Sequence, residues 1–192
     1  MRTVILGGGR SQRMGFDKLT ALFDGEPLAH RVARALLELD PLVVTTPQVA
    51  ATIADLHGVR VVETPPTAGP SVTLALANAA IASDAYLAVL AFDLPFLDAE
   101  RVRAFVARVP DDVDVAWPVV GGTPGHPVVW SPNARARIAS LGDDDPPSRI
   151  RNQPGIRVAA IEESDDAYVV DVDTPDAWTA AEERARRGAA GR

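Results

Sequence analysis

The residues with the clearest chemical potential lie in a glycine-rich segment near the start of the chain. Three consecutive glycines, Gly7, Gly8 and Gly9, follow a short apolar run, and Arg13 and Lys18 come soon after them. Glycine lets backbone N–H groups approach a phosphate closely, and the two cations would neutralise its charge. The segment has neither the third glycine of a dinucleotide fingerprint nor the Gly-Lys-Ser/Thr of a Walker-type loop. We therefore expect a phosphate-binding loop of another type.

Lys18 is distinguished by composition. It is the single lysine of the chain, since the other 18 of the 19 basic residues are arginine. Lysine provides a compact point charge on a flexible stem, which the planar guanidinium of arginine cannot imitate. We expect the loop of Lys18 to face solvent and its ammonium group to grip an anionic ligand.

Carboxylates at the ends of two apolar runs are candidate metal ligands. Asp93 follows the run 86–91, and both Asp171 and Asp173 come directly before Thr174-Pro175, where Asp173 is also suited to cap a helix. Hard cations such as Mg²⁺ prefer carboxylate oxygens, so we predict that Asp93 and Asp173 hold a metal. Alternation along a strand would point Asp171 away from the site. The sequence leaves open which of Asp171 and Asp173 is the second ligand.

The composition limits the class of protein. A chain of 192 residues suits one domain, which we assign to 1–187, with a disordered tail at 188–192. A net charge of −7 argues against a nucleic-acid polymer as partner, and no apolar run approaches the roughly 20 residues of a membrane span. The absence of cysteine excludes disulfides and thiolate metal sites. No signal peptide is visible, so we expect a cytoplasmic protein, monomeric or homodimeric.

Strand-like and helix-like runs alternate along the chain. Continuous apolar strands separated by helices are typical of an α/β fold with a mostly parallel sheet covered on both faces. Ligands of such folds bind beyond the carboxyl ends of the strands, where the glycine-rich loop and Asp93 are expected. The predicted strands are 3–6, 41–45, 59–63, 86–91, 113–117, 127–130, 158–161 and 168–172, and the predicted helices are 28–39, 49–56, 70–82, 98–109, 133–141 and 175–187.

Four motifs resemble those of the nucleotidyltransferases related to molybdenum cofactor guanylyltransferase and cytidylyltransferase. The segment 6–18 resembles the family signature L-A-G/A-G-x-S-x-R-M-G-x-x-K, and 92–96 resembles G/C-D-x-P-F. The segments 125–128 and 171–175 resemble G-H-P-V and D-I-D-T-P. The motifs occur in order over nearly the whole chain. The resemblance implies a Rossmann-like three-layer α/β/α domain of the type shared with sugar-nucleotide transferases.

The resemblance also implies an activity and a set of site residues. The protein would be a magnesium-dependent enzyme that transfers a nucleoside monophosphate from a nucleoside triphosphate to a phosphorylated small molecule such as molybdopterin. In this reading Arg13, Lys18 and Asp93 are catalytic, and Asp93 and Asp173 hold Mg²⁺. The nucleotide-binding residues would be Leu6, Gly7, Gly8, Gly9, Arg13, Lys18 and Ser71.

Two positions depart from the family pattern. Gly7 stands where the family usually has alanine, and Phe92 stands where glycine or cysteine precedes the metal-binding aspartate. The motifs at 6–9, 15–18 and 68–70 and the Phe92-Asp93 pair resemble the guanylyltransferase branch, whereas those at 125–128 and 171–175 resemble the cytidylyltransferase branch. Because the base is read near the first loop, the resemblance favours GTP over CTP.

Two alternatives to this function stay open. A sugar-phosphate nucleotidylyltransferase would use the same catalytic parts with another acceptor, and a non-catalytic relative would bind a nucleotide without turnover. His126 lies between Gly125 and Pro127, where contact with a ligand and a structural role are equally consistent with the sequence. We expect Trp117 and Trp130, at the ends of strands, to belong to the core rather than to form stacking platforms.

Overall fold

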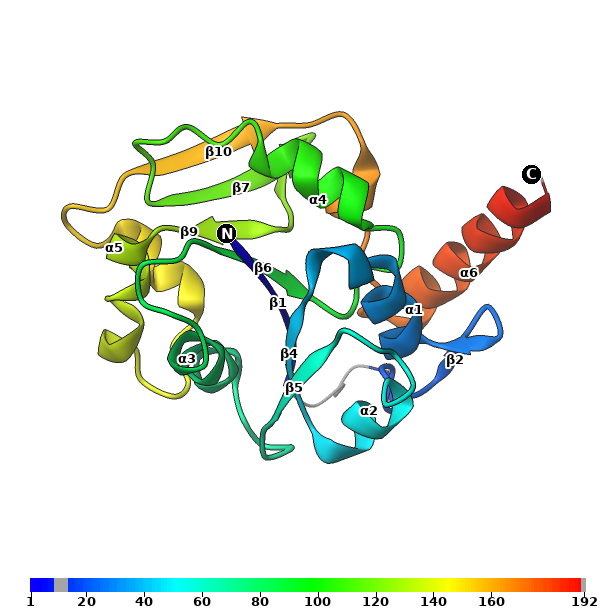
Figure 1. The fold of residues 1–192 in the computed structure, drawn as a ribbon. Coiled ribbons are helices and arrows are strands. Elements are labelled where there is room, and N and C mark those ends of the chain that lie inside the picture. The colour runs from blue at the N-terminus through cyan, green and yellow to red at the C-terminus, as the bar shows by residue number, and fades with distance from the viewer. Residues whose placement is uncertain (9–13, 191–192) are drawn as a thin grey trace.

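The computed structural model describes residues 1–8 and 14–190, which form a mixed β-sheet with helices on both faces (Figure 1). The sheet has the strand order β10-β7-β9-β6-β1-β4-β5, with β8 paired to β7. β9 runs antiparallel to β6 and β7, β8 runs antiparallel to β7, and the other neighbours are parallel, which confirms the expected mostly parallel sheet. The strands are β1 (Arg2–Gly7), β4 (Leu42–Thr45), β5 (Arg60–Glu63), β6 (Leu87–Ala91), β7 (Val115–Val120), β8 (Thr123–Pro124), β9 (Val128–Trp130) and β10 (Val158–Glu162).

The helices follow the predicted order, and short 3₁₀ turns add to them. None of the helices in the described part of the chain is long and apolar enough to cross a membrane. The closing helix extends to Ala190, beyond its expected end at 187. The α-helices are α1 (Leu28–Ala35), α2 (Pro47–Thr52), α3 (Pro70–Ala79), α4 (Ala99–Val106), α5 (Pro132–Arg135) and α6 (Pro175–Ala190), and the 3₁₀ turns are η1 (Leu37–Leu39), η2 (Ile138–Ser140), η3 (Pro147–Asn152) and η4 (Asp166–Tyr168).

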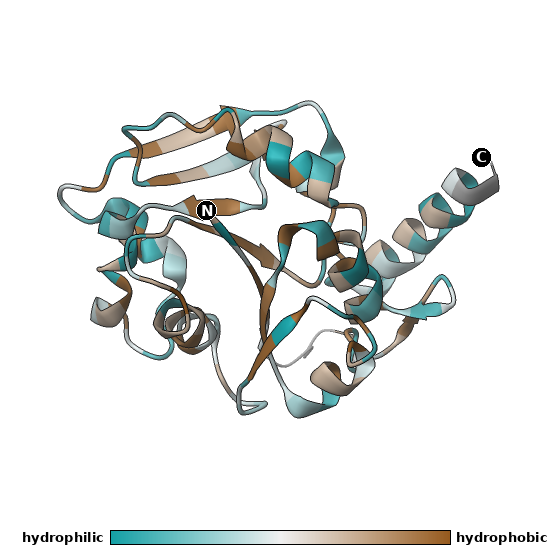
Figure 2. Cartoon of the chain, in the orientation of Figure 1, coloured by the Kyte–Doolittle hydropathy of each residue, from teal (hydrophilic) through white to brown (hydrophobic). Residues whose placement is uncertain are grey.

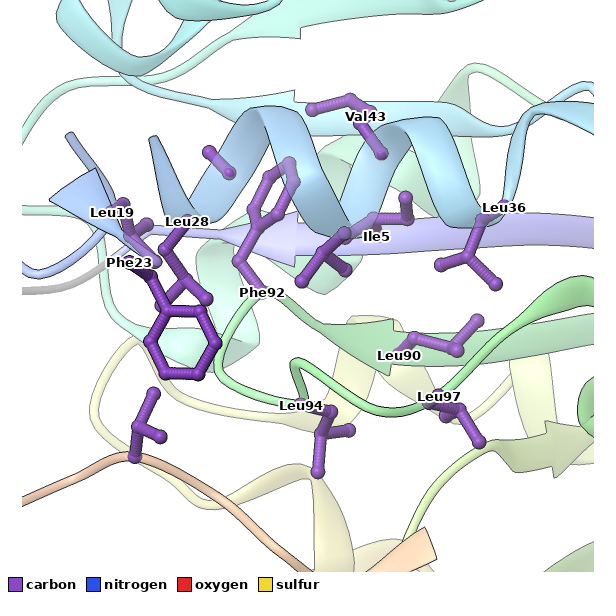
Figure 3. Close-up of a cluster of buried hydrophobic side chains, with 14 of the residues drawn as sticks. Ile5, Leu19, Phe23, Leu28, Leu36, Val43, Leu90, Phe92, Leu94 and Leu97 are labelled. Atoms are coloured by element: carbon purple, nitrogen blue, oxygen red, sulfur yellow. The ribbon is translucent and has the colours of Figure 1, made fainter. Parts of the chain in front are cut away.

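Alternating side chains of the central strands bury opposite faces of the sheet. In β1, Val4 belongs to the core beneath α3 and α5, whereas Ile5 belongs to the core beneath α1, α4 and α6. The central strands accordingly form the hydrophobic middle of the ribbon (Figure 2). Figure 3 shows Ile5, Val43 and Leu90 from three strands packed near Leu28 and Leu36. This period of two is the physical basis of a three-layer α/β/α arrangement.

The predicted strand at 168–172 was wrong. The 3₁₀ turn η4 ends at Tyr168 and no strand follows it: the Asp165 carboxylate accepts from the Ala167 N–H, and the Val169 N–H donates to the Asp166 carbonyl. The Ser164-Asp165-Asp166 sequence carries this turn signal. Other elements were not predicted: η3, the short strand β8, and a hairpin of β2 (Leu22–Phe23) with β3 (Glu26–Pro27).

Candidate active site

A cavity of about 670 Å³ lies at the carboxyl ends of β1 and β6 and continues toward β9 and β7. Leu6, Gly7 and Gly8 line it from the end of β1, and Asp93 lines it from the end of β6. Its location beyond the carboxyl ends of parallel strands is where α/β folds bind ligands. Gly9 and Arg13, also predicted to bind nucleotide, lie outside the described residues.

Gly7 is glycine because its surroundings leave no room for a side chain. A Cβ atom there would lie 2.6 Å from Cδ2 of Phe92 and 2.7 Å from Oγ1 of Thr45. Phe92 is buried, and Figure 3 shows it beside Ile5 in the core. The two departures from the family pattern therefore compensate each other: the large Phe92 side chain occupies the space that an alanine at position 7 would need.

Gly8 is constrained in a similar way by helix α3. Its Cβ would lie 2.1 Å from Cγ2 of Thr73, a buried residue of α3 that also lines the cavity. The glycines thus let the backbone after β1 run close to the start of α3. This close approach leaves main chain, rather than side chains, at the wall of the cavity.

Lys18 joins the two carboxylates that were predicted to hold a metal. Its Nζ lies 2.9 Å from Oδ2 of Asp93 and also donates to Oδ1 of Asp173. The expectation that Lys18 faces solvent was wrong, because the residue is only 8% exposed. Desolvation opposes its charged form, but the Asp93 and Asp173 carboxylates outweigh that effect and raise the pKa of Lys18. The two carboxylates therefore keep the buried Lys18 ammonium group charged and hold it in place.

Backbone contacts bring Asp173 to this position. The N–H of Val172, a fully buried residue, donates to the carbonyl of Asp93 at 3.0 Å. Helix α6 begins directly afterwards, and its Trp178 packs edge-on against Phe23 and Phe16 at centroid distances of 5.3 and 5.5 Å. The segment before α6 is therefore tied both to the end of β6 and to the loop that carries Lys18.

Asp171 is exposed and is not held by a strand, because residues 171–173 form no strand, so the alternation argument does not apply to it. Desolvation and the neighbouring Asp173 and Asp93 carboxylates raise its pKa. Asp173 lines the cavity, whereas Asp171 is not part of the lining that the structure describes. Asp173 is thus the better placed of the two to act together with Asp93.

Ser71 is buried at the start of α3 and does not reach the cavity. Its hydroxyl donates to the main-chain carbonyl of Asp145, and its exposed fraction is 3%. The prediction that Ser71 contacts nucleotide is therefore not supported by its position, because its donor is already committed to the protein. Pro70 and Thr73 of the same helix line the cavity instead.

His126 and two aromatic residues line the far end of the cavity, at β9 and β7. The Nδ1 atom of His126 lies 3.2 Å from the Val89 carbonyl, which can only accept, so Nδ1 is the donor and Nε2 is left for other contacts. Trp130 belongs to the core as expected, but it lines the cavity too. Trp117 is only half-buried and lines it as well.

Arg151 is the cavity residue that the sequence analysis missed. Its guanidinium carbon lies 4.4 Å from the centroid of the Trp117 ring, and both side chains line the cavity. Arg151 belongs to η3, which follows the polar stretch 142–148 and has no strong helical pattern. The sequence signals that this stretch packs against the domain were Pro147 and the apolar Ile150, which the structure buries.

Comparison with protein families gives one match over most of the chain. The model described as "MobA-like NTP transferase domain" matches residues 3–158. A "Probable molybdenum cofactor guanylyltransferase" of Natronomonas pharaonis is 35% identical over 122 residues, which cover 60% of this chain. The alignment spans 59% of the length of that relative, which is less than two thirds.

Solved structures have the same fold. A nucleotidyl transferase from Methanothermobacter thermautotroptrophicus matches with a TM-score of 0.81 and 20% identity, covering 97% of this chain and 98% of that one. A Mycobacterium tuberculosis H37Rv protein, solved in complex with manganese, matches with a TM-score of 0.74 and 21% identity, covering 95% of this chain and 97% of that one. At these identities the similarity concerns the α/β nucleotidyltransferase fold alone.

Proposed function

This chain belongs to the family of MobA-like NTP transferase domains, and from this premise we propose that it transfers GMP from GTP to a phosphorylated acceptor such as molybdopterin. Pyrophosphate is the second product. The proposal places a single catalytic domain in the cytoplasm, as a monomer or homodimer, with no nucleic-acid polymer and no membrane as partner.

The observation that carries this proposal is the convergence of Lys18, Asp93 and Asp173 beside the glycine-rich backbone. The two carboxylate partners of Lys18 are distant in sequence: Asp93 is 75 positions away and Asp173 is 155 positions away. A cation and two acids in a cavity that is also lined by the main chain of two glycines are the equipment that phosphoryl chemistry requires. A merely structural ion pair would not need a cavity or the tight glycines.

The carboxylates suit a magnesium ion. Asp93 and Asp173 offer hard oxygen atoms close enough to share one cationic group, which in this structure is the Lys18 ammonium. Within residues 1–8 and 14–190, no group of three or more His, Cys, Asp or Glu side chains could hold a metal. Mg²⁺ is commonly held by one or two carboxylates together with water and substrate phosphates. When bound by Asp93 and Asp173, it would neutralise charge on the phosphates of the two substrates.

The remaining residues orient the reactants. An oxygen of the acceptor phosphate attacks the α-phosphorus of GTP, the new P–O bond forms, and the bond to the β-phosphate oxygen breaks. Lys18 and Arg13 bind the phosphate oxygens on which negative charge grows, and the backbone at Gly7 and Gly8 positions the nucleotide. A phosphate nucleophile is already ionised near neutral pH, so the reaction needs no protein base to activate it.

The choice of GTP over CTP rests on the base-proximal motifs and on the guanylyltransferase name of the Natronomonas pharaonis relative. A guanine pocket leaves polar groups unpaired when cytosine enters, at roughly 1–3 kcal/mol for each buried group. Calorimetric titration in magnesium buffer should give tighter binding of GTP than of CTP. Tighter CTP binding would overturn the guanine assignment without touching the transferase proposal.

A pyrophosphate-release assay tests the reaction itself. The four nucleoside triphosphates are assayed with molybdopterin and with a panel of sugar phosphates. GTP-dependent release that requires molybdopterin supports the proposal, and release that requires a sugar phosphate identifies the alternative acceptor class. Asp93→Asn should abolish magnesium-dependent release, and Asp173→Asn should weaken it and raise the magnesium requirement. Full turnover in Asp93→Asn would place the metal elsewhere.

A further inference from the structure

The β7 end of the cavity contains a cation that the proposed chemistry at Lys18 does not use. Arg151 is half-buried, lines the cavity and stacks on Trp117, with 4.4 Å between the guanidinium carbon and the ring centroid. Its Nε donates to the Ser148 carbonyl at 3.4 Å. Within the described residues it forms no ion pair with a carboxylate. Its neighbour Arg149 differs, because it points outward and pairs with Asp145 at 2.6 Å.

Stacking leaves the donors of Arg151 available. A guanidinium that lies on an aromatic face is stabilised by the ring, while its N–H groups remain free in its own plane. Those N–H groups form a fork that matches two oxygens of one phosphate. Arg151 is thus oriented for an oxyanion, and Trp117 is the residue that positions it.

The rest of this end of the cavity is also rich in donors. Ser148 lies on the cavity wall beside Arg151, and His126 lines the same region. The two acids of the cavity lining, Asp93 and Asp173, are both bound to Lys18. A region with surplus donors and no unpaired acid favours an anionic ligand that is rich in oxygen atoms.

The fold holds Arg151 at this place. Its neighbour Ile150 is fully buried, and the preceding loop is joined to the start of α3 by the hydrogen bond from Ser71 to Asp145. Arg135 joins α5 to the end of the same helix α3, where it donates to the carbonyls of Asn78, Ile81 and Ala82. Arg151 therefore belongs to a packed segment rather than to a loose surface turn.

We propose that Arg151, held over the Trp117 ring, binds the phosphate group of the acceptor. The inference rests on the proposed function, in which Gly8 and Lys18 bind the nucleotide phosphates and the acceptor phosphate approaches them from the β7 side of the same cavity. Trp117 packs against the core cluster that contains Trp130, but it is only half-buried, and its ring also supports the guanidinium. Leu74, Val89 and Val128 line the cavity with apolar surface on which the body of such an acceptor can lie.

Binding of inorganic phosphate tests the inference without requiring turnover. The probe is added to protein saturated with GTP, so that Lys18 is already engaged, and the intrinsic tryptophan emission is followed. The wild-type protein and Arg149→Gln, a matched arginine of η3 outside the cavity, should show a saturable change. Arg151→Gln should show none, and Arg151→Lys should need a higher phosphate concentration. An unresponsive wild type, or an Arg151→Gln variant that responds like the wild type, would overturn the proposal.

Steady-state kinetics then separates the acceptor from the nucleotide. In Arg151→Gln the KM for molybdopterin should rise at least tenfold, as expected for loss of a charge-assisted contact, while the KM for GTP stays unchanged. Trp117→Leu should raise the same KM, and Trp117→Phe should restore most of it because a flat ring remains. Equal KM values for the acceptor in all variants would contradict the inference. Absence of turnover with every acceptor would instead reject the proposed function, and the phosphate titration would still decide the role of Arg151.

Discussion

Lys18 occupies the position between two carboxylates where a divalent cation is proposed to bind. Metal and Lys18 therefore compete for Asp93 and Asp173, and the ammonium group must move toward the nucleotide phosphates when the metal enters. The buried ion pair is costly to break on one side only, since the remaining acids lose their neutralising partner. Unlike a solvent-facing lysine, Lys18 thus holds the two carboxylates in place and also takes part in the proposed reaction.

Lys18→Gln tests this competition. Nucleotidyl transfer should fall by roughly 10²–10³, the range for loss of a group that stabilises charge in a transition state. Binding of Mn²⁺ in the absence of nucleotide should become tighter, because no ammonium competes for the carboxylates. Electron paramagnetic resonance of free Mn²⁺ measures this affinity. Lys18→Arg, which keeps a positive charge, is the control and should not gain affinity. Equal Mn²⁺ affinity in the wild type and Lys18→Gln would exclude competition.

Gly7 and Phe92 form a second coupled pair, this time through packing. Gly7→Ala should destabilise the protein because the new Cβ would collide with the Phe92 ring. The same change made in a Phe92→Cys background should cost less, with a coupling of about 1–2 kcal/mol between the two positions. Urea unfolding of the two single variants and the double variant measures the coupling. Additive losses would mean that the Thr45 hydroxyl, and not Phe92, sets the limit at this glycine.

At the scale of elements, the start of α1 supports the segment that follows Lys18. The N–H groups of Leu28 and Ala29 donate to the carbonyls of Ala21 and Leu19. Glu26, in β3, accepts two hydrogen bonds of 2.9 Å from Arg34 and contacts His30 at 2.6 Å. These contacts connect the β2–β3 hairpin to α1. The first turn of α1 in turn holds the segment after Lys18 through the N–H groups of Leu28 and Ala29.

The contacts of Glu26 with Arg34 and His30 should make the stability of the protein depend on pH in the acid range. The hydrogen bond from Arg34 lowers the pKa of Glu26 from 4.5 to about 2. His30 adds to this effect, whereas burial opposes it. A carboxyl with a lowered folded-state pKa stabilises the protein above pH 4.5, and this stabilisation is lost as the pH falls toward 2. The difference in unfolding free energy between the wild type and Glu26→Gln should therefore shrink over this interval. Glu38→Gln, at an exposed position, is the control, and a difference independent of pH would contradict the assignment.

At the scale of the whole molecule, α6 closes the site from the far end of the chain. Trp178 contacts Phe23 and Phe16, so the segment before α6 and the loop that carries Lys18 rest on one aromatic cluster. Asp173 lies just ahead of this helix, and the Val172 N–H fixes it to Asp93. The docking of α6 thus positions the second carboxylate of the proposed metal site.

Trp178→Ala should lower both the stability of the fold and the affinity of the site for a metal, because Trp178 supports Asp173 and the loop that carries Lys18. Loss of a buried tryptophan should lower the unfolding free energy by about 3–5 kcal/mol. It should also weaken Mn²⁺ binding in the presence of GTP, because Asp173 loses its fixed position. Trp178→Phe keeps an aromatic ring and should retain most of both quantities. If Mn²⁺ affinity survives in Trp178→Ala while stability falls, α6 stabilises the fold without positioning Asp173.

The sequence by itself determined the strands of the main sheet and the residues with chemical potential. The apolar run 86–91 contains the mostly buried strand β6, and Lys18 and Asp93 lie where post-strand loops were expected. These features are local, because strand periodicity and glycine-rich turns are encoded within a few neighbouring residues. The order of the motifs along the chain likewise supported the family and its three-layer fold.

Only the tertiary structure decided which side chains meet. Lys18 and Asp173 are 155 positions apart, and their contact depends on the irregular segment that stands in place of the predicted strand and on the docking of α6. The burial of Lys18, the committed hydroxyl of Ser71 and the stacking of Arg151 on Trp117 have the same origin. Periodicity gives the face of an element that is buried but not its neighbour across space, since that neighbour is selected by the packing of the whole domain.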